Sequence, residues 1–272
     1  MSSARSDMEF RPCIDIHNGK VKQIVGSSLA DKNDSARENF VAQKDAGYYA
    51  GLYREKGIKG GHIILLNPVS SDYYEATKAQ ALCALRAYPQ GMQIGGGIND
   101  TNAEAYLAAG ASHVIVTSFV FRDGYIHMEN LERMRAAVGR EHLVLDLSCR
   151  MKDGKYYIVT DRWQKFTQVA VEERTLDMLG AYCGEFLIHA VDVEGKNQGI
   201  EEQLVQSLGC WSGDTPVTYA GGVHSYEDIK KIKALGGGRI HVTVGSALDL
   251  FGGTLEVDRI MELIAGSHQH AE

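Results

Sequence analysis

The sequence has few prolines and none of the features that divide a chain into domains or carry it into a membrane. Only four of its 272 residues are proline, and it has no linker rich in proline and serine and no low-complexity tract. No apolar run approaches about 18 residues, so we expect no transmembrane helix. Residues 1–9 are polar and do not resemble a secretory signal. We therefore expect a single domain over residues 1–272, with flexible tails at 1–9 and 267–272.

The sequence also lacks an excess of basic residues and a pairing pattern of cysteines. Its net charge of −7 argues against a general nucleic-acid binder, which normally carries a basic excess. The five cysteines form no CxxC motif, and Cys13, Cys83 and Cys183 lie inside apolar runs. Such cysteines indicate reduced thiols. We expect a cytoplasmic monomer that binds a small molecule, with no nucleic-acid or membrane partner.

Two glycine-rich strand ends recur along the chain. The segment MQIGGGI at 92–98 has a counterpart in VTYAGGV at 217–223, and VTS at 116–118 has one in VGS at 244–246. Backbone amides at such glycines can point at phosphate oxygens, because no side chain keeps the anion away. Two clusters predict a substrate that carries two phosphates. The expected phosphate-binding residues are Gly96, Gly97, Thr117 and Ser118 in the first cluster, and Gly221, Gly222, Gly245 and Ser246 in the second.

Two aspartates occupy matching positions ahead of the glycine clusters. Asp15 lies in the apolar run PCIDI at 12–16, and Asp146 lies in LVLDL at 143–147. Each is followed by a turn that contains glycine and lysine, at 18–20 and 153–155. One such aspartate is more often a cap or a satisfied buried carboxylate. Two at equivalent places in a repeat favour a functional role.

Strand and helix patterns alternate over the whole chain. This alternation predicts a (β/α)8 TIM barrel, an α/β fold, with a two-fold half-barrel repeat and an active site at the carboxyl ends of the strands. A doubly wound sheet is the alternative. A polar loop is expected at 17–44, a helix N-cap at Asp100 and a small hairpin arm near 155–160. The strands are expected at 10–16, 62–66, 92–95, 113–117, 142–147, 186–191, 216–220 and 240–245, and the helices at 45–56, 75–87, 101–110, 128–138, 172–182, 200–208, 226–235 and 255–265.

The ordered set of motifs resembles a known family. The segments CIDIHNG (13–19), DLSCR (146–150), HAVDVEG (189–195) and AGG (220–222) are similar to those of the histidine-biosynthesis barrel isomerases, in particular their eukaryotic-type branch. The resemblance implies an Amadori rearrangement of an aminoaldose to an aminoketose on a bis-phosphorylated ribotide. It implies no metal and no cofactor.

The resemblance also implies roles for individual residues. Asp15 takes the place of the general base that removes the C2′ proton, and Asp146 that of the second catalytic carboxylate. Glu194 takes the place of the proton donor that opens the ribose ring, with Asp192 as a competitor on the same loop. The roles of two further residues remain open. Trp163 matches a tryptophan that stacks on the imidazole base or packs in the core, and Arg150 binds a phosphate or forms a local salt bridge.

The chain departs from the family pattern at several positions. Bacterial-type members usually have arginine at the places of Gln23 and Asn99. The loop after the sixth strand is one residue shorter, which leaves Ala190 at the place of a threonine. His17 and His189 lie near strand ends, but without metal-ligand spacing we interpret them as ordinary polar contacts.

Two other functions compete with the isomerase. The sister barrel that closes the imidazole ring is a lyase with a glutaminase partner, and it needs a lysine on the first loop. Lys20 and Lys22 lie at other positions along the first loop than that lysine, so neither is a clear match. A non-catalytic phosphosugar binder is the third possibility, and the presence of both strand-end acids argues against it.

Overall fold

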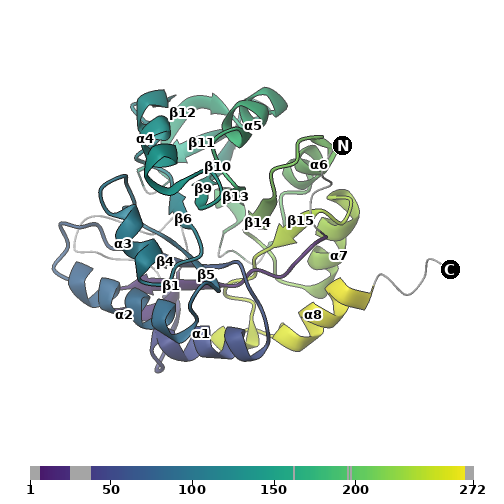
Figure 1. Ribbon diagram of the computed structural model, residues 1–272. Helices are drawn as coiled ribbons and strands as arrows, with labels where there is room; N and C mark the ends of the chain where they lie inside the picture. The colour runs from purple at the N-terminus through teal and green to yellow at the C-terminus, as the bar shows by residue number, and fades with distance from the viewer. Residues whose placement is uncertain (1–6, 25–37, 162, 195, 197, 267–272) are drawn as a thin grey trace.

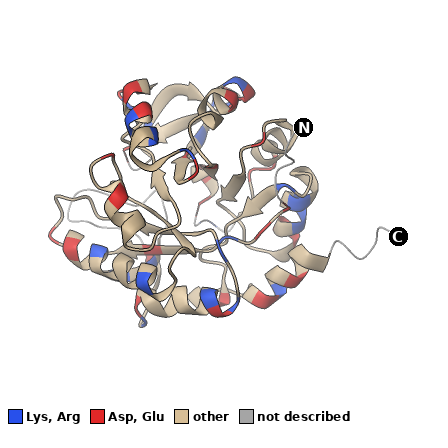
Figure 2. Ribbon diagram, in the orientation of Figure 1, with Lys and Arg blue, Asp and Glu red and all other residues tan. Residues whose placement is uncertain are grey.

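A computed structural model describes residues 7–24, 38–161, 163–194, 196 and 198–266. The strands lie at the centre of the molecule and the helices surround them (Figure 1). Many lysines, arginines, aspartates and glutamates lie on these outer helices, and others lie in the loops and strands between them (Figure 2). No helix among the described residues is long and apolar enough to cross a membrane.

A ten-stranded sheet organises the chain, and eight of its strands are parallel. Each parallel strand is followed by a helix, except where short additional elements intervene. The parallel strands are β1 (Cys13–His17), β4 (Gly61–Leu65), β5 (Met92–Gly95), β6 (Val114–Val116), β9 (Leu143–Asp146), β13 (Glu185–His189), β14 (Val217–Ala220) and β15 (Ile240–Val242). The helices are α1 (Ala46–Glu55), α2 (Tyr74–Ala87), α3 (Ala103–Ala108), α4 (Met128–Val138), α5 (Glu173–Gly180), α6 (Glu202–Cys210), α7 (Tyr226–Leu235) and α8 (Val257–Ala265).

The two ends of the parallel sheet approach each other. Phe10, just before β1, forms a parallel bridge with Val242 at the end of β15. The Arg11 amide donates to the Val242 carbonyl at 2.9 Å, and the Val242 amide donates to the Glu9 carbonyl at 2.9 Å. The fold is therefore an α/β fold with a curled, mainly parallel sheet, consistent with a TIM-type barrel.

The expected polar loop at 17–44 is wrong in part, because it contains two strands. β2 (Lys20–Ile24) pairs antiparallel with β1, and β3 (Glu38–Val41) pairs with β2. Asn18 and Gly19 turn the chain with φ of 51° and 72°, the left-handed pair that a two-residue hairpin requires. Residues 25–37 lie outside the described part of the chain.

The expected hairpin arm is present and larger than expected. β10 (Cys149–Lys152), β11 (Lys155–Thr160) and β12 (Lys165–Ala170) form a three-stranded antiparallel sheet. We call this sheet the arm. Its first turn, at Asp153 and Gly154, has φ of 50° and 79°, which nearly repeats the turn after β1. A second small pair, β7 (Phe121–Arg122) and β8 (Tyr125–Ile126), was not expected.

The expected N-cap at Asp100 is wrong. α3 begins at Ala103, and Asn102 occupies the N-cap position without a side-chain hydrogen bond to the helix. The Asn102 side chain instead accepts the amide of Asn99 at 2.9 Å, which closes a local turn. Asp100 pairs with Arg133 on α4 at 2.6 Å.

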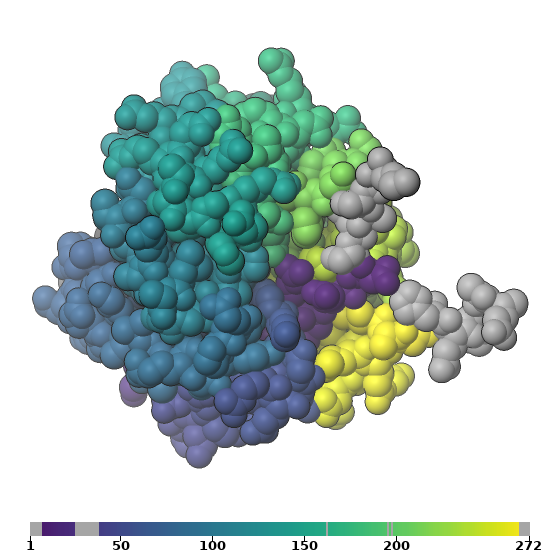
Figure 3. Space-filling view, viewed as in Figure 1, coloured from purple at the N-terminus to yellow at the C-terminus, as the bar shows by residue number. Residues whose placement is uncertain are grey.

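The start of the chain is packed against its end. Met8 is buried, and its amide donates to the Gly238 carbonyl at 2.7 Å. In the space-filling view, the first described residues lie beside the last helix (Figure 3). The expected tail therefore does not include Met8 and Glu9, because β-type contacts with the end of the sheet hold them. Residues 1–6 and 267–272 of the expected tails lie outside the described residues.

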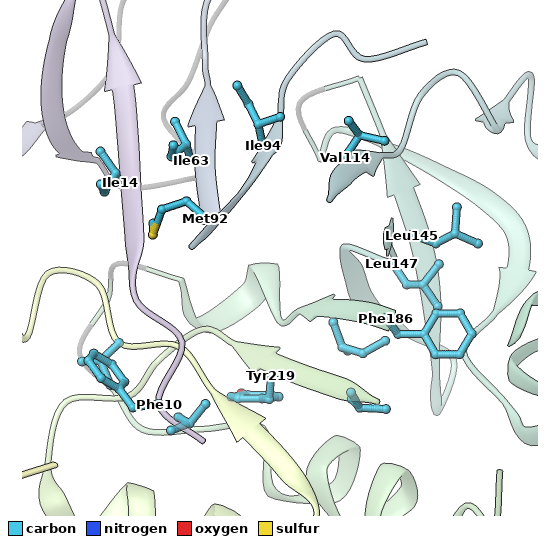
Figure 4. Packing of buried hydrophobic residues seen from close by; sticks show 14 of the residues in the cluster. Phe10, Ile14, Ile63, Met92, Ile94, Val114, Leu145, Leu147, Phe186 and Tyr219 are labelled. Carbon is cyan, nitrogen blue, oxygen red and sulfur yellow. The ribbon is translucent and has the colours of Figure 1, made fainter. Parts of the chain in front are cut away.

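Apolar side chains on the outer face of the strands form the main core. Ile14, Ile63, Ile94 and Leu145 are fully buried and alternate with residues that face the interior of the sheet (Figure 4). A second, small cluster fills that interior. It consists of Ile115, Val144, Leu187 and Ala220, with Ile64 beside it.

A buried polar layer lies at the amino-terminal end of the strands. Arg11 forms an ion pair with Glu185 at 2.5 Å, and the exposed fractions of the two side chains are only 12% and 5%. Gln93 donates to one oxygen of Glu185 at 2.7 Å, and Thr218 donates to the other at 2.6 Å. One carboxylate therefore joins β5, β13, β14 and the segment before β1.

We predict that Glu185→Gln destabilises the protein by about 3–5 kcal/mol, because it leaves the buried Arg11 charge without its main partner while keeping the shape of the side chain. Asp258→Asn is the matched control. Asp258 forms a 2.5 Å pair with Lys56, but its side chain is 72% exposed, so its loss should cost less than about 1 kcal/mol. Urea unfolding measures both. Equal losses in the two variants would show that the buried pair has no special role.

Candidate active site

A cavity that is partly open to solvent lies at the carboxyl ends of the parallel strands. This is the end where enzymes with such sheets bind their ligands. Eight of the residues expected at the site from the sequence line this cavity. They are Asp15, Asp146, Trp163, Glu194, Gly221, Gly222, Gly245 and Ser246.

The order of the strands separates the acids and the glycine clusters. β4, β5 and β6 lie between β1, which carries Asp15, and β9, which carries Asp146. β13, β14 and β15 lie on the other side of β9. The first glycine cluster follows β5 and β6, and the second follows β14 and β15. In a curled sheet this order puts the two clusters on opposite sides, with the two aspartates between them.

Hydroxyl groups hold Asp146 in place. Ser148 donates to its Oδ1 at 2.8 Å, and Thr117 donates to its Oδ2 at 3.1 Å. Burial raises the pKa of Asp146 above its ordinary value, and these hydroxyls and His189 oppose the rise. Thr117 was expected to bind phosphate, but its hydroxyl donates to Asp146. Trp163 extends the chain of contacts, because its indole N–H donates to Ser148 Oγ at 3.1 Å.

Asp15 has a different environment. The pKa of Asp15 is raised from 3.8 to about 7, because burial and the nearby Glu194 raise it by more than His189 lowers it. Within the described residues, no hydrogen bond supports its ionised form as the hydroxyls support Asp146. A carboxylate whose pKa lies near neutrality can take up a proton and release it again, as a general base must.

His189 lies among the carboxylates at the end of β13. Its Nε2 forms an ion pair with Glu194 Oε2 at 3.0 Å. Burial lowers the pKa of His189, but Glu194, Asp146 and Asp15 outweigh it and raise the pKa to about 9. The edge of the Trp163 ring contacts the imidazole, with centroids 5.1 Å apart.

The sequence indicated a polar contact for His189, and the ion pair with Glu194 is such a contact, but its place in the cavity was not expected. The side chain lines the cavity and is charged at neutral pH. One signal in the sequence points to it, since it is a titratable residue at the carboxyl end of a barrel strand, and an acid follows five residues later.

Asp192 and Arg150 bind each other, away from the cavity. Arg150 Nε donates to Asp192 Oδ1 at 2.8 Å, and the Met151 amide donates to Oδ2 at 3.0 Å. Both oxygens of Asp192 are thus engaged with β10 of the arm. Of the two alternatives for Arg150, the local salt bridge is the one observed. Glu194, in contrast, faces the cavity.

The two glycine pairs have the same backbone conformation but different surroundings. Gly96 and Gly97 have φ of 100° and 72°, and Gly221 and Gly222 have 121° and 74°. A Cβ at Gly97 would meet nothing within 4 Å, whereas one at Gly222 would lie 2.0 Å from the Gly199 carbonyl oxygen. The second pair is buried under the loop after β13, so glycine is also required there for close backbone packing. Gly96, Gly97 and Ser118 do not line the cavity.

Gln23, which stands where bacterial-type family members have arginine, is buried beside the second glycine cluster. Its Nε2 lies 3.7 Å from Cys13 Sγ, and its Oε1 would lie 2.7 Å from a Cβ at Gly245. The only described groups with metal-ligand geometry are Cys13, Asp15 and His62, whose ligand atoms lie within 4.8 Å of one another.

The arrangement as a whole is suited to proton transfer. One carboxylate titrates near neutrality, a second is held by hydroxyls, a third pairs with an imidazolium, and an indole ring lies beside them. None of these groups is a thiolate or hydroxyl nucleophile activated by a base.

Comparison with known proteins identifies similar chains. The family described as histidine biosynthesis protein matches residues 9–255. A chloroplastic 1-(5-phosphoribosyl)-5-((5-phosphoribosylamino)methylideneamino)imidazole-4-carboxamide isomerase from Medicago truncatula is 53% identical over 93% of this chain and 80% of its own length. Isomerases of the same name from Yarrowia lipolytica and Saccharomyces cerevisiae are 46% and 43% identical, over 90% and 91% of this chain and 93% and 94% of their own lengths.

We predict that Asp15→Asn stabilises the folded protein above neutral pH. Because the pKa of Asp15 is raised to about 7, its ionisation opposes folding, and stability should fall as pH rises from about 4 to about 7. An asparagine does not ionise, so the variant should gain up to roughly 4 kcal/mol at about pH 8 and little at about pH 4. Urea unfolding at the two pH values measures the gain. A variant that is less stable than the parent at the higher pH would contradict this account.

Proposed function

The chain belongs to the histidine biosynthesis protein family, and we propose that it is the isomerase of histidine biosynthesis for which these relatives are named. Its substrate is 1-(5-phosphoribosyl)-5-((5-phosphoribosylamino)methylideneamino)imidazole-4-carboxamide. The reaction is an Amadori rearrangement that turns the phosphoribosylamino group into an aminoketose. The observation that carries the proposal is the pair of strand-end aspartates, Asp15 and Asp146, on one cavity.

Two proton transfers make up the reaction. An acid protonates the ribose ring oxygen so that the ring opens, and a base then removes the C2′ proton to give an enaminol, which collapses to the ketose. Asp15 is the base, because its pKa of about 7 allows it to accept a proton at neutral pH. Glu194 is the donor and passes on the proton that it takes up from the His189 imidazolium across their 3.0 Å contact. It faces the cavity, while both oxygens of Asp192 are engaged by the arm.

The other cavity residues position the substrate and balance charge. Asp146 is held by Ser148 and Thr117, so it presents its carboxylate in one orientation to the substrate hydroxyls. His189 is the positive charge that allows three carboxylates to share one cavity. Trp163 stacks on the imidazole ring of the substrate, since it lines the cavity and its N–H is already used by Ser148. None of these steps needs a metal or a cofactor.

The fold behind this site is a (β/α)8 barrel with a two-fold repeat. The matching turns at 18–19 and 153–154 support the repeat, as do the matching conformations of the two glycine pairs. Each half then contributes one catalytic aspartate and one phosphate site. The open surroundings of Gly97 support an anion site at the first cluster, and the position of Gly245 and Ser246 on the cavity supports the second.

The names of the relatives disfavour the two other functions. The matched chains are called isomerases, which argues against the ring-closing lyase and against a phosphosugar binder without activity. The chain acts as a monomer on its small bis-phosphate substrate, with no nucleic-acid or membrane partner. The setting we propose is cytoplasmic, whereas the Medicago truncatula relative is named chloroplastic.

We predict that Asp15→Asn lowers turnover by at least about 10²–10⁴-fold, because the substitution keeps the size of the side chain but removes the base. Substrate affinity should change little. Steady-state kinetics on the bis-phosphorylated aminoaldose, with ultraviolet detection and a separate binding titration, measure both. Near-normal turnover in the Asp15→Asn protein would rule out this mechanism.

Glu194→Gln and Asp192→Asn are a matched pair that identifies the donor. We expect the first to lower turnover about as much as Asp15→Asn, and the second to have a small effect, because Asp192 contacts Arg150 and not the cavity. The reverse order of effects would assign the donor role to Asp192.

We also predict two anion sites. A crystal grown in phosphate or sulfate should contain one anion by Gly96, Gly97 and Ser118, and a second by Gly245 and Ser246. Backbone amides at such turns bind phosphate without a charged side chain. If a crystal grown at a high concentration of phosphate or sulfate contained no ordered anion at either place, the basis for a bis-phosphate substrate would be lost.

A further inference from the structure

Three side chains with different ligand atoms meet at the bottom of the cavity. Cys13 on β1 pairs in register with His62 on β4, so the two residues are neighbours across the sheet. Asp15 lies two residues further along β1 and points to the same side. The sulfur, nitrogen and oxygen atoms of the three side chains lie within 4.8 Å of one another, and all three residues line the cavity.

We infer that Cys13, Asp15 and His62 form a binding site for a thiophilic divalent cation such as Zn²⁺, which inhibits the enzyme by binding Asp15. Thiolate, imidazole and carboxylate are the usual zinc ligands, and three protein ligands leave a fourth tetrahedral position for water. Mg²⁺ and Ca²⁺ prefer sets of oxygen atoms and fit this site poorly. The strand register brings the three side chains together at one place on the sheet.

Binding changes the protonation of the cysteine ligand. When the cation binds, the Cys13 S–H bond breaks, the proton leaves to solvent, and a metal–sulfur bond forms. Asp15 binds in its ionised form.

The surrounding charges leave the site net attractive to a cation. The carboxylates of Glu194 and Asp15 interact electrostatically with Cys13, and Glu194 also interacts electrostatically with Asp15. The imidazolium of His189 is the opposing positive charge. Asp146 faces the same cavity from β9. Three carboxylates and one new thiolate therefore outweigh one imidazolium when the cation is present.

Inhibition follows from the role of Asp15 and rests on the proposed function. A carboxylate that is bound to a metal ion cannot accept the C2′ proton, and the ion also occupies part of the cavity. Zinc should thus compete with the substrate. The metal site itself depends only on the three side chains and can be tested without any assay of activity.

Cobalt(II) is the probe for the site, because a cobalt–thiolate bond absorbs in the near ultraviolet. The purified protein, treated with a chelator and then freed of it, should bind one equivalent of Co²⁺ with this band, and Zn²⁺ should displace it, as the order of divalent affinities requires. Cys13→Ser should abolish the band. Cys210→Ser, which removes an exposed thiol outside the cavity, is the control and should keep it.

In the activity assay, zinc should inhibit competitively, and a chelator should restore turnover. Cys13→Ser should raise the half-inhibitory zinc concentration by about tenfold or more, since even the loss of an outer-shell partner costs 10–100-fold in metal affinity. If Cys13→Ser does not fold, His62→Gln should weaken cobalt binding by a similar factor, with folding checked by circular dichroism.

The outcomes separate the two proposals. A protein that isomerises the substrate but shows no cobalt–thiolate band, or shows the same band in Cys13→Ser, overturns the metal site and leaves the proposed function standing. A protein that shows the band but has no isomerase activity keeps the metal site and overturns the proposed function. Activity that requires zinc would overturn the inhibitory role.

Discussion

The buried ion pair between Arg11 and Glu185 sets the relative height of the strands that carry the site. Arg11 lies two residues before β1, and Glu185 is the first residue of β13. Asp15 is four residues beyond Arg11, and His189 is four residues beyond Glu185. At about 3.3 Å per residue, each lies about 13 Å above the ion pair. One contact at the amino-terminal end of the strands therefore brings Asp15 and His189 to the same level.

The cavity combines groups that would not be stable together in isolation. Burial raises the pKa values of Asp15 and Asp146, and both carboxylates oppose folding to the extent that they are ionised. His189 reduces this cost at both positions, and it keeps its own charge because of them. The raised pKa of Asp15 is thus a direct result of a site in which buried carboxylates lie close together.

The sequence predicted the parts of the molecule that follow from local patterns. Alternating apolar runs located all eight parallel strands, and the repeated aspartates and glycines pointed to the correct end of the sheet. The sequence did not predict contacts between residues that lie far apart along the chain. The hydroxyl of Thr117 was expected at phosphate but binds Asp146 from another strand. For Arg150 the sequence left open a phosphate or a local salt bridge, and only the fold shows the salt bridge with Asp192. Asp100 was misread because the neighbouring Asn102 closes its own turn. His189 depends on three carboxylates brought together only by the fold.

The contact between the arm and the loop after β13 has a consequence for how molecules enter and leave the cavity. Asp192 joins Arg150 and Met151 on β10, while Trp163, at the far turn of the same arm, lies against His189. The loop that carries Glu194 and the arm that carries Trp163 are thus tied to one another. We expect them to move as one unit, so the residence time of a bound molecule is set by a single concerted motion and not by two independent ones.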